Sequence, residues 1–320
     1  FDLMGVHDIG TMNEVRRALD RIDPSILLYG EGWTAARSPL DESLRAVKRA
    51  GPRLPRIAVF DDDLRDALRG GWGDSTEPGF VSGKSGLDRN VRFGVVGATA
   101  HFQVGFDSSG DSPFAYGGHS AETINYVSCH DDLSLVDKLR ASAPEGMTEE
   151  ELVRFDKLAQ TVVLTAQGIP SLFAGEEMLR TKGGVSNSHD SPDRVNRIDW
   201  SFKADHKDVF DYYRGLIALR RTHPAFRLAT AAEIERHLRF LDTGDTHVVA
   251  YMLVDHAGDD PWREILVVYN GARAEKRVRI PPGDWHAVCL DGRIASEALA
   301  VFSGDSVPVP ASSALIAYLP

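Results

Sequence analysis

Short apolar runs alternate with helix-like patterns over the first two thirds of this 320-residue chain, and this alternation constrains the fold most. The apolar runs predict strands at 1–4, 26–29, 57–60, 123–128 and 169–174. Repeated strand–helix units form a parallel sheet, because parallel neighbours need a long, usually helical connection. An eight-stranded βα barrel needs three or four more units than these five strands supply. The sequence therefore predicts an α/β fold that contains the C-terminal portion of a barrel.

Helix signals separate the predicted strands. Capping boxes at Thr11 and Thr148, each with Glu three residues later, open two helices, and Gly168 is expected to end the second. Further helices are expected at 40–47 and at about 208–221. Between these elements lies a glycine-rich stretch without periodicity, which predicts a loop-rich binding surface at 70–118.

The pattern changes near residue 229 to short β-rich runs that turn residues separate. These runs lie at 247–254, 264–269, 276–280, 285–290 and 314–319. Closely spaced strands of this kind predict a small antiparallel β-sandwich. We therefore expect two domains. The first, 1–228, is a partial (β/α)8 barrel entered at about strand 4, and the second, 229–320, is the sandwich.

Charge and composition exclude several classes of partner. The formal net charge of −11 repels nucleic acid, so a neutral substrate fits better. Cys129 and Cys289 match no zinc spacing and are expected to be buried thiols. The chain has no apolar run of about 18 residues, so no membrane-spanning helix is predicted.

Acidic residues follow three predicted strands, at Asp2, Glu31 and Asp131. The carboxyl ends of barrel strands face one cleft, so these side chains are expected to converge. A pair of carboxyls in one cleft is what glycoside hydrolysis requires, one as nucleophile or base and one as acid. A third carboxylate stabilises positive charge on the sugar ring.

Each residue alone has a structural explanation as well. Asp2 can cap the following turn, and the run His130-Asp131-Asp132 can be a solvated charge cluster or a helix cap. Glu31 between two glycines is harder to explain in this way, because the glycines allow a close backbone approach. Spacing alone does not identify the reaction.

Six sequence blocks carry a resemblance to a known family. FDLMG at 1–5, YGEGW at 29–33 and NYVSCHD at 125–131 resemble blocks of the α-amylase superfamily, in its order. Three longer segments resemble its starch-debranching branch, the type I pullulanases: AQGIPSLFAGEEMLRTK at 166–182, SNSHDSPDRVNRIDW at 186–200 and GLIALRRTHPAFR at 215–227. The resemblance implies a retaining hydrolase that cleaves α-1,6-glucosidic bonds in pullulan, amylopectin or limit dextrins.

The resemblance assigns roles to individual residues. Asp2 takes the nucleophile position, Glu31 the general acid/base position and Asp131 that of the transition-state stabiliser, while His130 hydrogen-bonds the sugar. Retention then predicts that the carboxyls of Asp2 and Glu31 lie about 5–5.5 Å apart. No cofactor is required.

Weaker candidates surround this core. Asp193 and Arg197 are implied to bond sugar hydroxyls, although an i,i+4 surface ion pair is the alternative. Trp33 is expected either to stack on a sugar or to form a packed wall of the cleft, and Asn187 is a further candidate for substrate contact. The family often binds calcium, but the chain shows no compact loop of oxygen ligands.

The chain also departs from the family pattern. Asp132 stands where asparagine is usual, and His189 and Asp190 stand where tyrosine and asparagine are more familiar. We expect the chain to be N-terminally truncated, to fold poorly alone and to hydrolyse nothing, whereas its full-length parent is active. The alternatives are an α-1,4-glucan hydrolase or transglycosylase of the same superfamily, or a non-catalytic glucan-binding protein. Localisation and oligomeric state are not readable.

Overall fold

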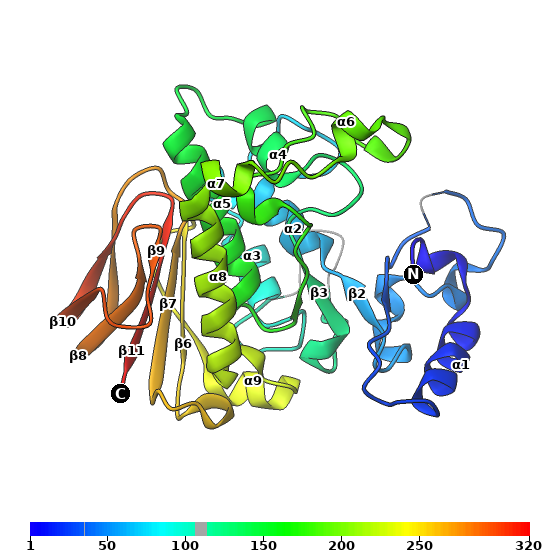
Figure 1. The fold of residues 1–320 in the computed structure, drawn as a ribbon. Helices are drawn as coiled ribbons and strands as arrows, with labels where there is room; N and C mark the ends of the chain where they lie inside the picture. Colours follow the sequence, from blue (N-terminus) through cyan, green and yellow to red (C-terminus); the bar gives the residue numbers. More distant parts are fainter. Residues whose placement is uncertain (35, 106–113) are drawn as a thin grey trace.

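Two sheets and the helices between them make up the described part of the molecule. The computed structural model describes residues 1–34, 36–105 and 114–320. A four-stranded parallel sheet has the order β1-β2-β3-β4, and a seven-stranded antiparallel sheet follows later in the chain. Figure 1 shows helices α5 and α8 standing between the two sheets, with α1 on the far side of the parallel sheet. An α/β portion followed by antiparallel strands was predicted, and this part of the prediction is confirmed.

The parallel strands are short. They are β1 (Tyr29–Gly30), β2 (Ala58–Phe60), β3 (Thr123–Asn125) and β4 (Ile169–Pro170). The strand predicted at 1–4 is not formed, because the chain leaves the extended region at Leu3, whose φ is 46°. Phe1 nevertheless pairs with the β1 segment through both its amino group and its carbonyl group. Its amino group donates to the Tyr29 carbonyl at 2.8 Å, and its carbonyl accepts from the Glu31 amide at 2.9 Å.

Two long helices form the centre of the molecule. The helices in chain order are α1 (Ile9–Asp20), α2 (Asp62–Arg69), α3 (Asp88–Val95), α4 (Leu135–Ala141), α5 (Glu149–Thr165), α6 (Asp193–Asn196), α7 (Phe202–Asp205), α8 (Lys207–Thr222) and α9 (Ala231–His237). The predicted capping box opens α5, where Thr148 and Glu151 satisfy each other's backbone amides. Gly168 lies beyond the end of α5 rather than capping it. A Cβ there would lie 2.9 Å from the Asn125 side chain, so only glycine fits this turn into β4.

The antiparallel sheet has the order β10-β8-β11-β7-β6-β5, and β9 pairs with β8. Its strands are β5 (Leu238–Leu241), β6 (Val248–Leu253), β7 (Glu264–Asn270), β8 (Lys276–Leu290), β9 (Arg293–Ile294), β10 (Ala300–Val309) and β11 (Ser313–Leu319). Two strands predicted at 276–280 and 285–290 are one strand, β8. The prolines between them face a register shift in β10 between Gly304 and Ser306, where no ladder hydrogen bond is needed.

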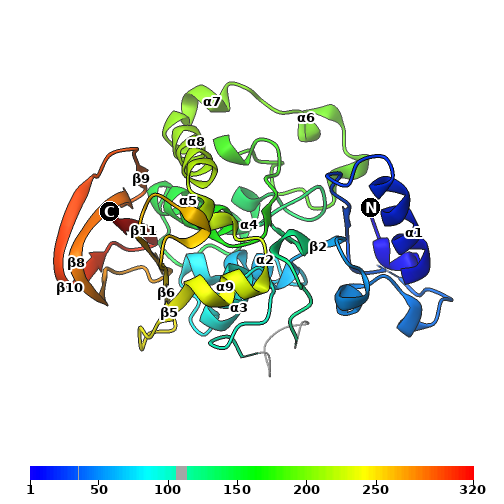
Figure 2. The same ribbon diagram turned by 90° about the horizontal axis from the view of Figure 1, so that it is seen from below.

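Both faces of this sheet are buried. Val249, Tyr251 and Val267 belong to the core that the sheet shares with the helices. The alternate residues Val248 and Ala250 belong to a second core, which includes Trp285 of β8. Period-2 alternation therefore places apolar side chains on both sides. The strongly bent β8 and β10 curl at one edge of the molecule, as Figure 2 shows from below.

The prediction of a helix at 40–47 is wrong. Short 3₁₀ turns form at Glu42–Leu44 and Lys48–Arg53, with an extended link between them. That link pairs with the first segment of the chain, where the Ala46 amide donates to the His7 carbonyl. The Ala46 amide therefore donates to a residue distant in sequence instead of to a carbonyl within a helix. The first capping box is wrong as well, because Asp8 caps α1 by accepting from the Thr11 amide.

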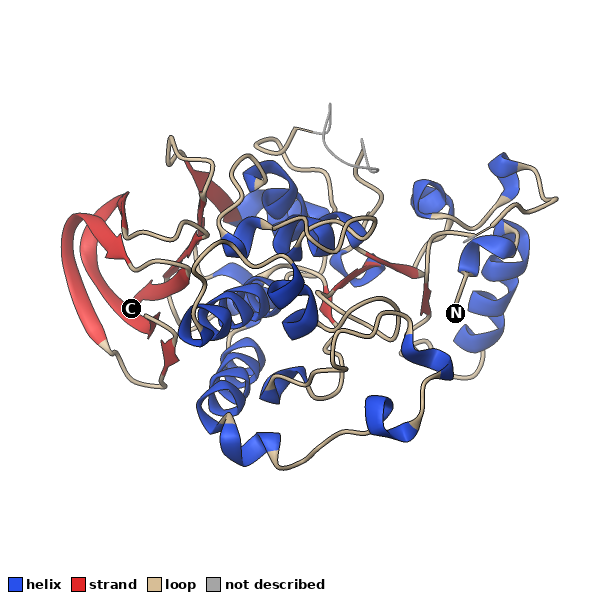
Figure 3. Ribbon diagram, turned by 90° about the horizontal axis from the view of Figure 1, so that it is seen from above, coloured by secondary structure: helices blue, strands red, loops and turns tan. Residues whose placement is uncertain are grey.

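Several elements were not predicted from the sequence. The stretch 70–118 contains α3, and its residues 106–113 lie outside the described part of the chain. Helices α4 and α9 and strands β5 and β10 were also not predicted. Figure 3, coloured by secondary structure, shows the helices gathered between the two sheets and beyond the parallel one. Within the described residues, no helix is both long and apolar enough to span a bilayer.

Candidate active site

Glu31 lies at the end of β1 between two glycines that have no room for a side chain. A Cβ on Gly30 would lie 2.8 Å from the Phe1 carbonyl oxygen, and a Cβ on Gly32 would lie 2.8 Å from the Lys48 amide nitrogen. The glycines therefore let neighbouring backbone segments close in on both sides of Glu31. The close backbone approach expected at these glycines is therefore made by other segments of the protein.

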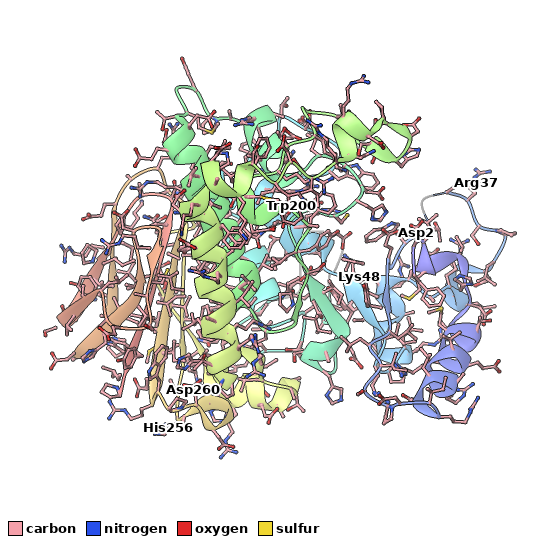
Figure 4. The ribbon with its side chains drawn as sticks, viewed as in Figure 1. Asp2, Arg37, Lys48, Trp200, His256 and Asp260 are labelled. Carbon is pink, nitrogen blue, oxygen red and sulfur yellow. The ribbon has the colours of Figure 1, made fainter. Side chains whose placement is uncertain are left out.

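The first residues of the chain hold the Glu31 carboxylate. The Leu3 amide donates to Glu31 Oε2 at 3.0 Å, and the Glu31 side chain is only 4% exposed. Asp2 precedes Leu3 and is exposed. Figure 4 labels Asp2 on the side of the N-terminal segment that faces the rest of the molecule. The left-handed turn at Leu3 thus directs the Leu3 amide to the Glu31 carboxylate and leaves the side chain of Asp2 exposed to solvent.

A loop after β3 completes the cluster. His130 Nε2 lies 3.9 Å from Glu31 Oε1 and 3.5 Å from Asp131 Oδ1. Asp2, Glu31 and His130 each place one polar atom within 4.8 Å of the others. The structure therefore brings together four residues that the sequence singled out, Asp2, Glu31, His130 and Asp131. They come from two separate strand ends and from the segment that pairs with β1.

The environment of Glu31 favours its protonated form. Burial raises the pKa of Glu31, and both the hydrogen bond and the negative charge of Asp2 raise it further, with a contribution from Asp131. The Leu3 amide opposes this shift. A carboxyl with a raised pKa beside a second, exposed carboxyl is the arrangement in which one group gives a proton and the other attacks.

Trp33 follows Glu31 by two residues but lines a pocket that none of the four cluster residues lines. It lines a pocket of about 290 Å³ together with Lys48 and Phe114. Lys48 is buried there between Asp62 and Asp63, with its Nζ 2.9 Å from Asp63 Oδ2. The pocket therefore combines the aromatic side chains of Trp33 and Phe114 with charged side chains.

The remaining predicted residues occupy the segment 186–200. Asn187 reaches the site loop, because its Oδ1 accepts from the Asp132 amide at 2.8 Å. Asp193 opens α6, and the ion pair with Arg197 that was the alternative to a sugar site is not formed. Arg197 lies 3.7 Å from Asp199 instead. Within the described ranges, no hydrogen bond or ion pair joins Asp193 or Arg197 to the carboxylate cluster.

Sequence reasoning missed the residues that support the site loop. Arg69, Lys182 and Glu176 contact it from α2 and from the segment after β4. Burial raises the pKa of Glu176 to about 8, and its carboxyl bonds Ser128 and Gln160. The signal available was a pair of arginines, Arg65 and Arg69, one turn apart on a short acidic helix.

Asp2, Glu31 and His130 are also the one group of this kind, in the part of the chain that the structure describes, whose donor atoms could share a metal ion. Two carboxylates and an imidazole suit a transition metal. Calcium takes six to eight oxygen ligands, which this group does not offer.

Comparison with known proteins shows the relationship. A family model described as "Pullulanase, all-beta domain" matches residues 234–293. The pullulanase of Bacillus subtilis (strain 168) is 36% identical over 281 residues, which are 88% of this chain. The chain is homologous to pullulanases. It spans 38% of the length of that relative.

Solved pullulanase structures match the fold. The pullulanase from Bacillus acidopullulyticus superposes with a TM-score of 0.91 at 40% identity, covering 99% of this chain and 37% of that one. Apo pullulanase from Paenibacillus barengoltzii gives 0.89 at 42% identity, over 100% of this chain and 47% of its own. The same enzyme has been solved with maltohexaose and α-cyclodextrin. The pullulanase homology predicted from the six sequence blocks is therefore confirmed.

Proposed function

We propose that this chain carries the catalytic carboxylates of a retaining glycoside hydrolase that cleaves α-1,6-glucosidic bonds in pullulan, amylopectin or limit dextrins. The observation that carries the proposal is the meeting of Asp2, Glu31 and His130 within 4.8 Å, in surroundings that raise the pKa of the Glu31 carboxyl. Homology to pullulanases supports the substrate class, and relatives solved with malto-oligosaccharides support an α-glucan ligand.

The first step uses both carboxyls. The Asp2 carboxylate attacks the anomeric carbon, while the bond from that carbon to the glycosidic oxygen breaks and Glu31 gives its proton to the departing oxygen. Positive charge that builds on the sugar ring faces the carboxylate of Asp131. An oxygen of Asp2 within 4.8 Å of one of Glu31 supports retention, because inverting pairs stand about 6.5–9.5 Å apart.

The second step releases the sugar. The Glu31 carboxylate takes a proton from water, whose oxygen attacks the anomeric carbon and displaces Asp2. His130, exposed beside both acids, is placed to bond a sugar hydroxyl. The reaction balances with water alone, so no cofactor is needed.

Further contacts fall to the surrounding residues. Trp33 is assigned to stacking on a sugar ring at the neighbouring pocket that it lines, and Asn187 to a sugar contact through its amide nitrogen, since its oxygen binds the site loop. Asp193 and Arg197 are assigned to sugar hydroxyls farther from the cleaved bond, where Arg197 is exposed. These assignments follow the sequence blocks and the position of the segment 186–200.

We also propose the domain arrangement that this function needs. Residues 1–228 are assigned to part of a (β/α)8 barrel, entered at about strand 4, because they form four parallel strands and the chain spans 38% of the length of the Bacillus subtilis pullulanase. Residues 229–320 are assigned to a β-sandwich domain, which the second core between curled parts of the sheet supports.

The test measures reducing sugar released from pullulan and from linear amylose. One sample is the 320-residue chain. The other, called the extended chain, joins these residues to the segment that precedes the matched region in the Bacillus subtilis pullulanase. Release of a trisaccharide from pullulan alone by the extended chain supports debranching. Cleavage of amylose alone assigns an α-1,4 hydrolase, and glucan binding without cleavage assigns a binding protein.

A further inference from the structure

The loop that carries His130 and Asp131 contains one residue in the left-handed region. Asp132 has a φ of 60°, in the left-handed region that L-residues other than glycine, asparagine and aspartate rarely adopt. Such a conformation persists only where surrounding contacts determine it. The contacts of Asp132 therefore decide how firmly the loop presents His130 and Asp131 to Glu31.

Asp132 makes three contacts outside its own loop. Its Oδ2 accepts from Arg69 Nη2 at 2.7 Å, and its Oδ1 accepts from Ser186 Oγ at 3.2 Å. Its backbone amide donates to Asn187 Oδ1 at 2.8 Å. Side chain and backbone are thus bound from two directions, by helix α2 and by the segment at 186–187.

Arg69 holds the loop at a second point. Its Nη1 donates to the Leu133 carbonyl at 2.9 Å, so one guanidinium bridges a carboxylate and the next residue's backbone. The Arg69 side chain is 1% exposed. A planar fork of this kind bonds two acceptors at once, which a lysine cannot reproduce.

Asp132 supplies a negative charge to Arg69 as well as a hydrogen-bond acceptor. Burial lowers the pKa of Arg69, and the nearby charge of Arg65 lowers it further, while Asp132 opposes both effects. Arg65 pairs with Asp66, and the neighbouring Lys138 bonds two backbone carbonyls. Asp132 is the carboxylate that bonds Arg69 directly. Asparagine, the residue usual in the pullulanase-like pattern, could accept the same hydrogen bond but would remove the negative charge that bonds this buried guanidinium.

A separate tether supports the same loop. Lys182 Nζ donates to the His130 carbonyl at 3.3 Å. The backbone of Lys182 is held in turn by Asp137, whose Oδ2 accepts from the Lys182 amide at 2.7 Å. This tether holds the backbone of His130, whereas Arg69 bonds Asp132 and the Leu133 carbonyl.

We propose that Arg69 and Asp132 are positioning residues for the hydrolysis, and that their buried ion pair fixes the loop that presents His130 and Asp131 to the carboxylates of Glu31 and Asp2. The inference rests on the proposed function. Neither residue touches the substrate. Their effect passes through the backbone of residues 130–133.

The test compares Arg69→Met, Arg69→Lys, Asp132→Asn and the double variant Arg69→Met/Asp132→Asn in the extended chain. Hydrogen exchange of the amides at 130–133 and the kinetics on pullulan are both measured. We expect each single variant to speed exchange at this loop at least tenfold. Turnover falls at least tenfold in Arg69→Met and Asp132→Asn, with KM changed less than threefold. The loss of turnover is smaller in Arg69→Lys than in Arg69→Met. The double variant loses no more than the worse single one, because it removes both members of the pair.

A matched surface pair provides the control. Arg140→Met removes an exposed ion pair with Glu149 and should leave exchange at 130–133 and turnover unchanged. Unchanged loop exchange in Arg69→Met and Asp132→Asn, or losses that simply add in the double variant, overturns the inference. If the unsubstituted extended chain cleaves no glucan, the proposed function fails, and loop exchange alone decides whether the pair orders the loop.

Discussion

His130 Nε2 lies 3.9 Å from Glu31 Oε1, although the two residues follow different strands of the parallel sheet. Strands β1 and β3 do not pair with each other, since β2 lies between them. The contact is made because both residues stand at the carboxyl ends of their strands, where loops converge over one end of the sheet. Asp2 enters the same space from the segment that pairs with the outer side of β1.

Removing the charge of Asp2 should lower the pKa of Glu31. Asp2 raises that pKa through a hydrogen bond and a like charge, so Asp2→Asn takes away both contributions while burial remains. The shift is followed by carboxyl carbon NMR of Glu31 over a pH series. Glu14→Gln, which changes an exposed acid on α1, should leave the Glu31 titration unchanged. A Glu31 titration that does not move in Asp2→Asn contradicts the coupling.

Stability should fall as pH rises toward 8, because of buried carboxyls. Burial raises the pKa of Glu176 to about 8 and that of Asp156 to about 7, from ordinary values of 4.5 and 3.8. Between the ordinary and the folded value, the folded state holds a proton that the unfolded state has lost. The free energy of unfolding then falls with pH, by at most about 1.4 kcal/mol per pH unit for each group.

Glu176→Gln should therefore flatten this fall. The midpoint of thermal unfolding of the extended chain is measured from pH 5 to pH 9, beside Glu149→Gln, which changes an exposed acid at the start of α5. We expect the decline to be shallower in Glu176→Gln and unchanged in the control. Parallel declines in all three proteins would show that Glu176 is ionised throughout.

Arg197→Ala should weaken sugar binding without slowing the chemical step. The loss of one charged hydrogen-bond donor to a hydroxyl predicts a KM for pullulan about tenfold higher, with kcat unchanged. Asp199→Asn is the matched control, since Asp199 is the ion-pair partner of Arg197. If Asp199→Asn raises KM equally, the ion pair rather than a sugar contact explains the effect.

The sequence predicted the parts of the fold that depend on local pattern. The capping box at Thr148 and the long apolar face behind it place α5 correctly, because these signals lie within a few residues of one another. The helix expected at 40–47 failed for the opposite reason. The Ala46 amide bonds the His7 carbonyl, a partner that no local pattern reveals.

The candidate site follows the same division. Asp2, Glu31, His130 and Asp131 were found because a parallel sheet brings strand ends together and because three short blocks resemble a known family. Arg69 and Glu176 act from other elements on the loop behind the acids. Their roles depend on side-chain packing across the fold, which spacing along the chain does not encode.

The most direct test of the account replaces the proposed acid alone. Glu31→Gln keeps the size of the side chain and its bond to the Leu3 amide but removes the proton donor. In the extended chain, we predict release of trisaccharide from pullulan, a turnover at least 100-fold lower in Glu31→Gln, and affinity for malto-oligosaccharides within a few-fold of the original. Equal turnover in the two proteins would contradict the assignment of Glu31 and, with it, the mechanism.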